Sequence, residues 1–489
     1  MNPEGRLFIN NKYVPSSTGD TLTVINPADD NTVTEQVQAA SPSDVDHAVA
    51  CAKEAFKTWK KTPSKQRAAI MLKFADILEK HVNEVAKLES IAMGAPITLA
   101  RRVVAGQPAI WRYYAGLIGK LGGEVFPAEE GEEGGTSYYR LVNYEPLGVC
   151  AGIAAWNGTQ LFASWKIAPA VAAGNTVLFK SSEKSPLGVL YLGGLFREAG
   201  FPPGVINLLS GAGKVGAQLA SHMDIAKISF TGSTAVGRKI QIAAAQSNLK
   251  IVSLELGGKS ASLVFADANL ENAVLHNSHG FLFNNAQVCT ACSRILVQED
   301  IAPKFVLALQ KAFADAAQLI GDPALPSTVL GPLADKAQRD RVAGFVERAK
   351  QQGIEVLAGG GSGHDDGQRG QFFTPTILLN PDTTSEVYTD EIFGPVAVVK
   401  TFKSEEEGIA LANDTHYGLA GAIFTSDVSR ALRVASQIEA GTVGVNSVPM
   451  LSNETPFGGW KQSGYGRESG MHGLRGYLQT RTVMINTKA

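Results

Sequence analysis

Apolar and polar positions along the chain follow two regular patterns from residue 149 onward. Short apolar runs predict strands, and the stretches between them carry apolar residues at helical spacing. The predicted strands span 149–154, 176–179, 205–209, 227–230 and 251–254, and the predicted helices span 165–173, 186–199 and two segments that start near 213 and 234. This alternation predicts a parallel, doubly wound α/β sheet with right-handed crossovers.

A second alternating region begins near Ser260 and continues to about Asn446. It contains a predicted helix from about Leu270 and a predicted strand at 294–297. The segment 353–370 is rich in Gly, His and Asp, and we expect it to form a surface loop.

The N-terminal part has a different pattern. The pattern of residues up to about 26 predicts a strand-rich segment. Apolar spacing then predicts one helix over 43–59 and another over 64–94. The segments 138–142 and 482–486 resemble exposed strands. Because exposed strands have unpaired backbone groups, these two segments are candidates for pairing with each other or with another subunit.

Composition indicates a globular protein without an evident macromolecular or membrane partner. The 489 residues are too many for one core and suggest two or three domains. A net charge of -2 gives no electrostatic case for binding nucleic acid or an anionic membrane. No apolar run approaches the roughly 20 residues that span a bilayer. The first residues lack a basic segment followed by an apolar one, so a cytoplasmic location is expected.

Four cysteines occur, which is too few for a disulfide framework in a chain of this length. Cys51 and Cys150 lie in apolar patterns and are interpreted as small core residues. Cys289 is open to three interpretations: a buried helical residue, a redox pair with Cys292, or a nucleophile, which would need a base or a donor-rich site. A second cysteine pair for zinc is absent, so no metal site is predicted.

Two further segments suggest a ligand site at the carboxyl edge of the sheet. Glu255 directly follows an apolar strand and precedes two glycines, a position where ligands gather in open α/β sheets; an ordinary loop glutamate is the alternative. The segment 230–237 combines a strand, a glycine turn and a helix start, which suits a pyrophosphate. A helix simply capped by Ser233 is equally consistent with that segment.

Taken together, these segments resemble the aldehyde dehydrogenase superfamily, and the resemblance extends from about residue 25 to 481. Its motifs occur in the family's order. They are the glutamate segment 254–260, the cysteine segment 283–292, Glu-Ile-Phe-Gly-Pro-Val at 391–396, Pro-Phe-Gly-Gly-Trp at the start of 456–464, and Gly-Arg-Glu at 466–468.

The resemblance implies a fold and a division of the chain. The expected fold is α/β, with a Rossmann-like cofactor domain, an α/β catalytic domain and a small β oligomerisation element. The implied division places the dinucleotide-binding domain at 1–124 and 147–257, the catalytic domain at 258–462, and the oligomerisation strands at 125–146 and 478–489. The family forms homodimers and homotetramers, and the sequence does not choose between them.

The resemblance also implies catalytic roles. Cys289 matches the nucleophile that attacks the aldehyde and forms a thiohemiacetal and then a thioester. Asn157 matches the side-chain donor of the oxyanion hole, and Glu255 matches the base that activates the hydrolytic water. Glu468 matches a carboxylate linked to proton transfer, and Lys166 matches a lysine that orients or tunes the site. Because Glu255 is present, hydrolysis is expected rather than transfer to coenzyme A.

The implied cofactor is NAD, with NADP as the alternative. Glu183 matches a carboxylate that binds two ribose hydroxyls and repels a 2′-phosphate, although Lys180 can also face a phosphate. The implied cofactor contacts are Ile153, Trp156, Lys180, Glu183, Gly213, Phe230, Gly232, Ser233, Leu256, Gly257, Glu391 and Phe393.

The substrate is expected to be a small-molecule aldehyde that is hydrophobic, either aromatic or medium-chain aliphatic. The chain departs from the family at Gly158, where relatives have an aromatic residue, and at Ala286, where a glycine is usual. The expected tunnel lining is Gly158, Phe162, Trp165, Phe283, Met450, Leu451 and Phe457, and each aromatic residue has core packing as its alternative. A binding or structural role on the same fold, and esterase activity through the same thiol, are the competing functions.

Overall fold

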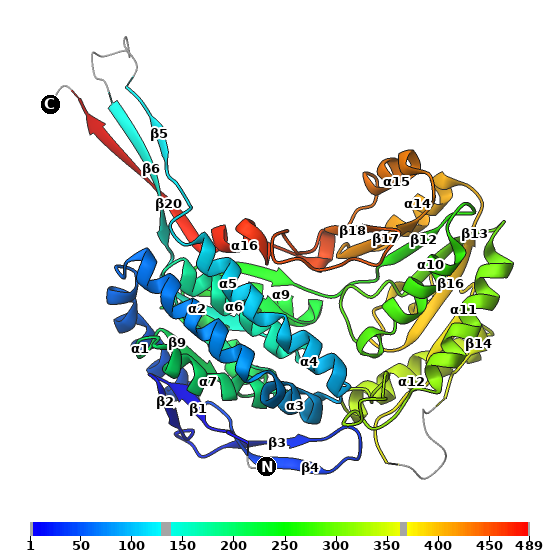
Figure 1. Cartoon of the computed structure of the whole chain (residues 1–489), viewed down its shortest axis with the longest axis horizontal. Coiled ribbons are helices and arrows are strands. Elements are labelled where there is room, and N and C mark those ends of the chain that lie inside the picture. The colour runs from blue at the N-terminus through cyan, green and yellow to red at the C-terminus, as the bar shows by residue number, and fades with distance from the viewer. Residues whose placement is uncertain (1–2, 129–137, 362–368, 488–489) are drawn as a thin grey trace.

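The computed structural model describes residues 3–128, 138–361 and 369–487. Figure 1 shows two α/β lobes side by side and a narrow β arm that extends away from the first lobe. Most of the chain before residue 256 forms the first lobe, and most of the rest forms the second. Within the described residues, no helix is both long and apolar enough to cross a membrane.

The first lobe is built on an eight-stranded sheet in the order β19-β11-β10-β7-β8-β9-β1-β2. Its central strands β7 to β11 run parallel, as the apolar runs predict. Strands β7 to β10 are buried along their whole length, which explains their mostly apolar sequences, whereas β11 is exposed at Ile251. The strands are β1 (Leu7–Ile9), β2 (Lys12–Val14), β7 (Val149–Ile153), β8 (Thr176–Lys180), β9 (Ile206–Leu209), β10 (Lys227–Thr231), β11 (Ile251–Glu255) and β19 (Gly464–Tyr465).

Helices cover both faces of this sheet (Figure 1). They are α1 (Pro42–Trp59), α2 (Ser64–Lys80), α3 (Val82–Met93), α4 (Ile97–Ala105), α5 (Gln107–Leu117), α6 (Thr159–Ala172), α7 (Leu187–Ala199), α8 (Gly213–Ser221) and α9 (Thr234–Gln246). Two strands, β3 (Thr21–Ile25) and β4 (Thr32–Gln38), pair beside them.

The prediction of one continuous helix over 64–94 is wrong. The chain leaves helical geometry at His81, with φ -103° and ψ 14°, and divides into α2 and α3. The His81 ring contacts the Tyr191 hydroxyl of α7, with 2.7 Å between Nδ1 and the oxygen. The apolar spacing continues through the break, so periodicity alone does not reveal it.

The second lobe is built on a seven-stranded sheet in the order β14-β15-β16-β13-β12-β17-β18. The strands are β12 (Ala261–Val264), β13 (Arg294–Gln298), β14 (Glu355–Ala358), β15 (Thr376–Leu379), β16 (Val396–Phe402), β17 (Ala420–Phe424) and β18 (Thr442–Val445). All neighbours are parallel except β14, which pairs antiparallel with β15 at the edge. The predicted surface loop at 353–370 is therefore wrong for Glu355–Ala358, and its residues 362–368 lie outside the described chain.

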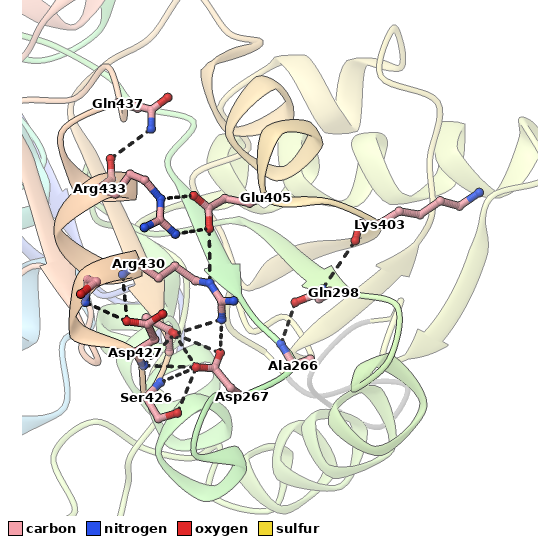
Figure 2. Close-up of polar contacts among 12 residues, drawn as sticks. Ala266, Asp267, Gln298, Lys403, Glu405, Ser426, Asp427, Arg430, Arg433 and Gln437 are labelled. Atoms are coloured by element: carbon pink, nitrogen blue, oxygen red, sulfur yellow. Dashed lines mark hydrogen bonds and ion pairs between the residues drawn. The ribbon is translucent and has the colours of Figure 1, made fainter.

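The second lobe also contains helices on both sides of its sheet. They are α10 (Leu270–Leu275), α11 (Ala302–Ala317), α12 (Lys336–Gln351), α13 (Glu386–Thr389), α14 (Glu405–Asn413) and α15 (Val428–Ala435). A polar network ties α14 and α15 to the loop after β12 (Figure 2). Arg430 bonds to Asp267 at 2.7 Å and to Glu405 at 3.3 Å, and Arg433 bonds to Glu405 at 2.7 Å. This network stabilises the outer layer of the lobe.

The arm is a three-stranded antiparallel sheet of β5 (Glu124–Phe126), β6 (Tyr138–Pro146) and β20 (Leu478–Asn486). The predicted pairing of the two exposed strand segments with each other is confirmed, with Leu478 opposite Pro146 and Asn486 opposite Tyr138. Residues 129–137 and 488–489 of the expected oligomerisation strands lie outside the described chain. The short helix α16 (Gly470–Arg475) connects the arm to the body.

Candidate active site

Glu255 is the last residue of β11, at the carboxyl edge of the first sheet. The parallel register places Thr231 of β10 directly beside it, and the Thr231 hydroxyl donates to Glu255 Oε2 at 3.3 Å. The Glu255 side chain is buried. Glu255 is therefore a fixed, desolvated carboxyl group rather than a solvated loop glutamate.

Cys289 lies in a turn that follows a strained backbone segment. Asn284, Asn285 and Ala286 all have left-handed backbone angles, with φ of 52°, 54° and 55°. The interpretation of Cys289 as a helical packing residue is therefore wrong. The Cys289 thiol is free and partly exposed, and its Sγ lies 3.8 Å from Glu255 Oε1. Cys292 is also free, and its Sγ contacts the Thr290 carbonyl instead of Cys289.

Asn157 joins the first sheet to the cysteine loop. It lies in the short 3-10 turn η1 (Trp156–Gly158) after β7. Its side-chain Nδ2 donates to the Gln287 carbonyl at 3.0 Å, two residues before Cys289. The Asn284 amide donates in turn to the Asn157 carbonyl at 3.4 Å. These two hydrogen bonds hold the Asn157 amide against the loop that contains Cys289.

Lys166 and Glu468 form a buried ion pair behind Glu255. The Lys166 ammonium also donates to Thr231 Oγ1 at 2.8 Å and to Ser229 Oγ at 3.1 Å. Contacts therefore run from Glu468 through Lys166 and Thr231 to Glu255. The sequence analysis missed Ser229 and Thr231. Two hydroxyl residues two positions apart on an apolar strand lie on the same face of the sheet, and this pattern could have indicated a buried polar site there.

Burial and nearby charge perturb both reacting groups. Desolvation and the neighbouring Glu468 carboxylate raise the pKa of Glu255 well above its ordinary value, and Lys166 opposes the shift. Desolvation and the charges of Glu255 and Glu391 raise the pKa of the Cys289 thiol in the same way. Each charge therefore disfavours ionisation of the other group.

The residues expected to hold a dinucleotide lie at the carboxyl edge of the first sheet. Lys180 ends β8, and its Nζ lies 3.2 Å from Glu183 Oε2. Burial lowers the pKa of Lys180. Ser233 caps the 13-residue helix α9 and accepts from the Val236 amide at 3.4 Å. Lys180 and Glu183 are thus a pair of opposite charges that suits ribose hydroxyls. The N-terminus of α9 suits a pyrophosphate, and it lies at the same edge of the sheet.

The second lobe contributes the other half of this edge. Glu391 Oε1 accepts from the Gly258 amide at 3.0 Å, and a side chain at Gly257 would overlap the Glu391 carboxylate. Burial raises the pKa of Glu391 to about 7. The Phe393 ring meets the Trp156 ring edge-on at 5.3 Å, with Phe393 at φ 61°. This closely fitted set of residues suits the nicotinamide half of a dinucleotide.

The remaining predicted cofactor residues lie at the same edge. Ile153 ends β7, Phe230 lies in β10, and Leu256 follows β11 and packs against α9. Gly213 begins α8 after β9, and Gly232 precedes the Ser233 cap. The residues present therefore fit a nicotinamide dinucleotide.

Comparison with known proteins identifies the family of this chain. A family model described as "Aldehyde dehydrogenase family" matches residues 13–483. The chain belongs to the aldehyde dehydrogenase family. The family assignment, the α/β fold class, the enzyme class and the nicotinamide cofactor class predicted from the sequence are thereby confirmed.

Three relatives illustrate the likeness. An aldehyde dehydrogenase of Davidiella tassiana is 43% identical over 98% of this chain and 95% of its own length. Human retinal dehydrogenase 2 is 42% identical over 98% of this chain and 91% of its own length. The structure of the P. syringae indole-3-acetaldehyde dehydrogenase AldA, a variant in complex with NAD+ and IAA, has a TM-score of 0.95 and 37% identity, covering 99% of this chain and 97% of its own.

The structure separates the predicted tunnel residues of this aldehyde dehydrogenase into three groups. Gly158 and Phe283 line a pocket that also borders Asn157. Phe162, Trp165 and Phe457 are buried and form a row of ring contacts, at 6.0 Å and 5.4 Å between centroids. Met450 and Leu451 do not line this pocket and are 68% and 47% exposed.

Proposed function

We propose that the protein oxidises a hydrophobic aldehyde, aromatic or medium-chain aliphatic, to a carboxylic acid with NAD, through a thioester on Cys289. The contact between Cys289 Sγ and Glu255 Oε1 carries this proposal, because it pairs a nucleophile with a base. Asn157, held beside the same loop, supports it.

In the first step, the Glu255 carboxylate accepts the thiol proton and the Cys289 sulfur adds to the aldehyde carbon. The carbonyl π electrons move to oxygen, and the resulting oxyanion takes hydrogen bonds from Asn157 Nδ2 and the Cys289 backbone amide. Preorganised donors of this kind lower a barrier by roughly 3–4 kcal/mol each. To serve in this way, Asn157 must exchange its Gln287 carbonyl partner for the oxyanion.

When bound, NAD would supply the hydride acceptor that oxidation of the thiohemiacetal to a thioester requires. On the protein side, Glu391 and Phe393 would position the nicotinamide end, and Lys180 and Glu183 the adenosine ribose. The Glu183 carboxylate favours ribose hydroxyls over a 2′-phosphate, which supports NAD over NADP. The solved relative with NAD+ bound supports the same choice.

Hydrolysis then releases the acid. Glu255 accepts a proton from water, the hydroxide oxygen bonds to the thioester carbon, and the carbon–sulfur bond breaks to return Cys289 as a thiolate. For this to happen, the proton that Glu255 took from the thiol must leave before hydrolysis, and Thr231, Lys166 and Glu468 form a chain of contacts that can carry it away from Glu255. In this role Lys166 and Glu468 are positioning residues, since they act through Glu255.

The preference for a hydrophobic substrate rests on the lining of the site. Phe283 and Gly158 border a largely apolar pocket beside Asn157, and the rings of Phe162, Trp165 and Phe457 contact one another in the buried core. Two of the relatives above are named for indole-3-acetaldehyde and retinal, which are large aldehydes with extended apolar parts.

We also propose that the arm joins copies of this chain into a homodimer or homotetramer. Apolar side chains of the arm are exposed, among them Val125, Phe126, Met484 and Ile485. An edge strand with exposed apolar residues is a ready surface for pairing with another chain. Light scattering on the purified protein tests this, and a monomer would contradict it.

The deciding experiment for the activity measures NADH and NADPH formation by purified protein across a panel of aldehydes. We expect turnover with hydrophobic aldehydes and NAD, and loss of that turnover in Cys289→Ala. Undiminished turnover in Cys289→Ala would overturn the mechanism. A profile in which small charged semialdehydes are the best substrates would overturn the substrate class.

A further inference from the structure

A pocket between α3, α4 and α6 opens beside the proposed oxyanion donor. It borders Asn157, Gly158 and Phe283 on the side of the active site. Its other walls are largely apolar and comprise Met93, Ala95, Leu99, Ala100, Val103, Val104 and Leu161. Because residue 158 is glycine, no side chain from that position separates the pocket from Asn157.

Apart from Asn157 and Asn284 on the side of the active site, two polar side chains interrupt this apolar lining. Glu89 of α3 and Gln160 of α6 both line the pocket and are only 6% and 1% exposed. Glu89 Oε1 and both polar atoms of the Gln160 amide make no well-aligned hydrogen bond among the described residues, although the Gln160 amide lies close enough to Glu89 to oppose the rise in its pKa. Leaving one such buried atom unpaired costs about 1–3 kcal/mol, so a group of this kind indicates a ligand or a functional role.

The fold makes specific room for this pair. A Cβ at Gly188 of α7 would overlap Gln160 Nε2 and lie 2.7 Å from Glu89 Oε1. Glycine inside a helix destabilises it by roughly 0.5–1 kcal/mol relative to alanine. Glu89 and Gln160 are thus held close together in a space that α7 leaves open for them.

We propose that this pocket is a substrate subsite that binds an uncharged hydrogen-bonding group, such as a hydroxyl, at the end of the substrate distant from the aldehyde. This inference rests on the function proposed above and narrows its substrate class. The preferred substrate combines an apolar middle with a distal hydroxyl, which bonds to Glu89 and Gln160.

The charge of the pocket selects a neutral group. Its lining contains no Lys, Arg or His, so a distal carboxylate would have no cationic partner and would face Glu89. Burial raises the pKa of Glu89 to about 8, so its carboxyl group is neutral at pH 7 and both donates and accepts. A distal ammonium would require Glu89 to ionise among apolar side chains.

The test compares kcat/KM for matched aldehyde series with purified wild-type protein. The series are unsubstituted n-alkanals and their ω-hydroxy, ω-amino and ω-carboxy counterparts, with five to nine carbons. At the chain length that reaches the pair, we expect the ω-hydroxy aldehyde to exceed the n-alkanal by about tenfold, the effect of one net hydrogen bond. Equal values at every length, or a preference for the amine or carboxylate, would overturn the inference.

Substitutions test which residues cause the preference for ω-hydroxy aldehydes. Gln160→Leu should remove most of the hydroxyl preference by raising KM for the ω-hydroxy aldehyde, with the n-alkanal changed by less than about threefold. The matched control is Gln107→Leu, since Gln107 is equally buried and bonds to Ser164 of α6 but does not line the pocket. It should keep the wild-type preference. If Gln160→Leu keeps the preference for ω-hydroxy aldehydes, other residues bind the hydroxyl and the inference is overturned.

A second variant covers the case in which Gln160→Leu does not fold. Leu99→Phe fills the pocket from α4 and should lower kcat/KM for the ω-hydroxy aldehydes while acetaldehyde is oxidised as before. Oxidation of n-alkanals without any hydroxyl preference would contradict only this inference. Absence of NADH formation with every aldehyde would contradict the proposed function itself.

Discussion

Cys289 Sγ lies 3.8 Å from Glu255 Oε1, although the two residues come from different lobes. This contact assigns two proton transfers to one carboxyl group, first from the thiol and later from water. The pKa of both groups is raised, so each favours its neutral form more than it would in water.

Replacing Glu255 separates the two chemical steps. Glu255→Gln keeps the size of the side chain but cannot accept a proton, so steady-state turnover should fall by at least about 10²-fold. Raising the pH supplies thiolate without Glu255, so the first turnover should recover while hydrolysis stays slow. Stopped-flow measurement should therefore show a burst of NADH at high pH followed by slow turnover. Steady-state turnover equal to wild type would contradict the role of Glu255.

The acid limb of the pH profile should depend on Glu468 and Lys166. Activity requires ionised Glu255, so kcat rises as pH passes through its pKa. Glu468 raises that pKa and Lys166 lowers it. Glu468→Gln should move the acid limb to lower pH, and Lys166→Met should move it to higher pH.

The measurement is the pH dependence of kcat for both variants beside wild type. A purely structural role for the buried pair would lower activity at all pH values without moving the limb. Shifts in the same direction for both variants would contradict the electrostatic assignment.

Cofactor preference should respond to Glu183. In Glu183→Gln the side chain no longer repels a 2′-phosphate, while Lys180 stays at the same site to attract one. We expect kcat/KM for NADP to rise about tenfold and that for NAD to fall. The comparison of NADH and NADPH formation with one aldehyde measures both changes, and an unchanged ratio would place the ribose elsewhere.

The left-handed backbone at Ala286 should carry strain. A residue other than glycine in this backbone region costs roughly 1–2 kcal/mol of strain in the folded state. Glycine removes this strain, but part of the gain is lost because glycine gives the unfolded chain more conformational freedom. Ala286→Gly should therefore raise the free energy of unfolding by up to about 1 kcal/mol. Thermal or urea unfolding measures it, with Ala75→Gly in α2 as a control that should lose stability. Destabilisation by Ala286→Gly would show that the methyl packing outweighs the strain.

The alternation of apolar and polar residues determined the architecture of each lobe. The strands from β7 to β10 were predicted correctly because strands buried on both faces have mostly apolar sequences, and the apolar run of β11 predicted that strand although Ile251 is exposed. The same signal failed at His81, where the periodicity continues through a helix break, and at β14, an edge strand that lies inside a glycine-rich segment. In both places a tertiary contact, to Tyr191 or to β15, decides the local structure.

The candidate site divides in the same way. The sequence by itself determined the family and the reactive residue types, since motifs such as the segment around Glu255 are local and contiguous. Only the tertiary structure decided that Thr231 meets Glu255, that Lys166 pairs with Glu468, and that Cys289 lies in a turn facing Glu255. It also decided that Glu89 and Gln160, 71 positions apart in the sequence, are neighbours in one pocket. These relationships depend on how sheets and helices pack, and packing joins residues whose separation along the chain carries no periodic signal.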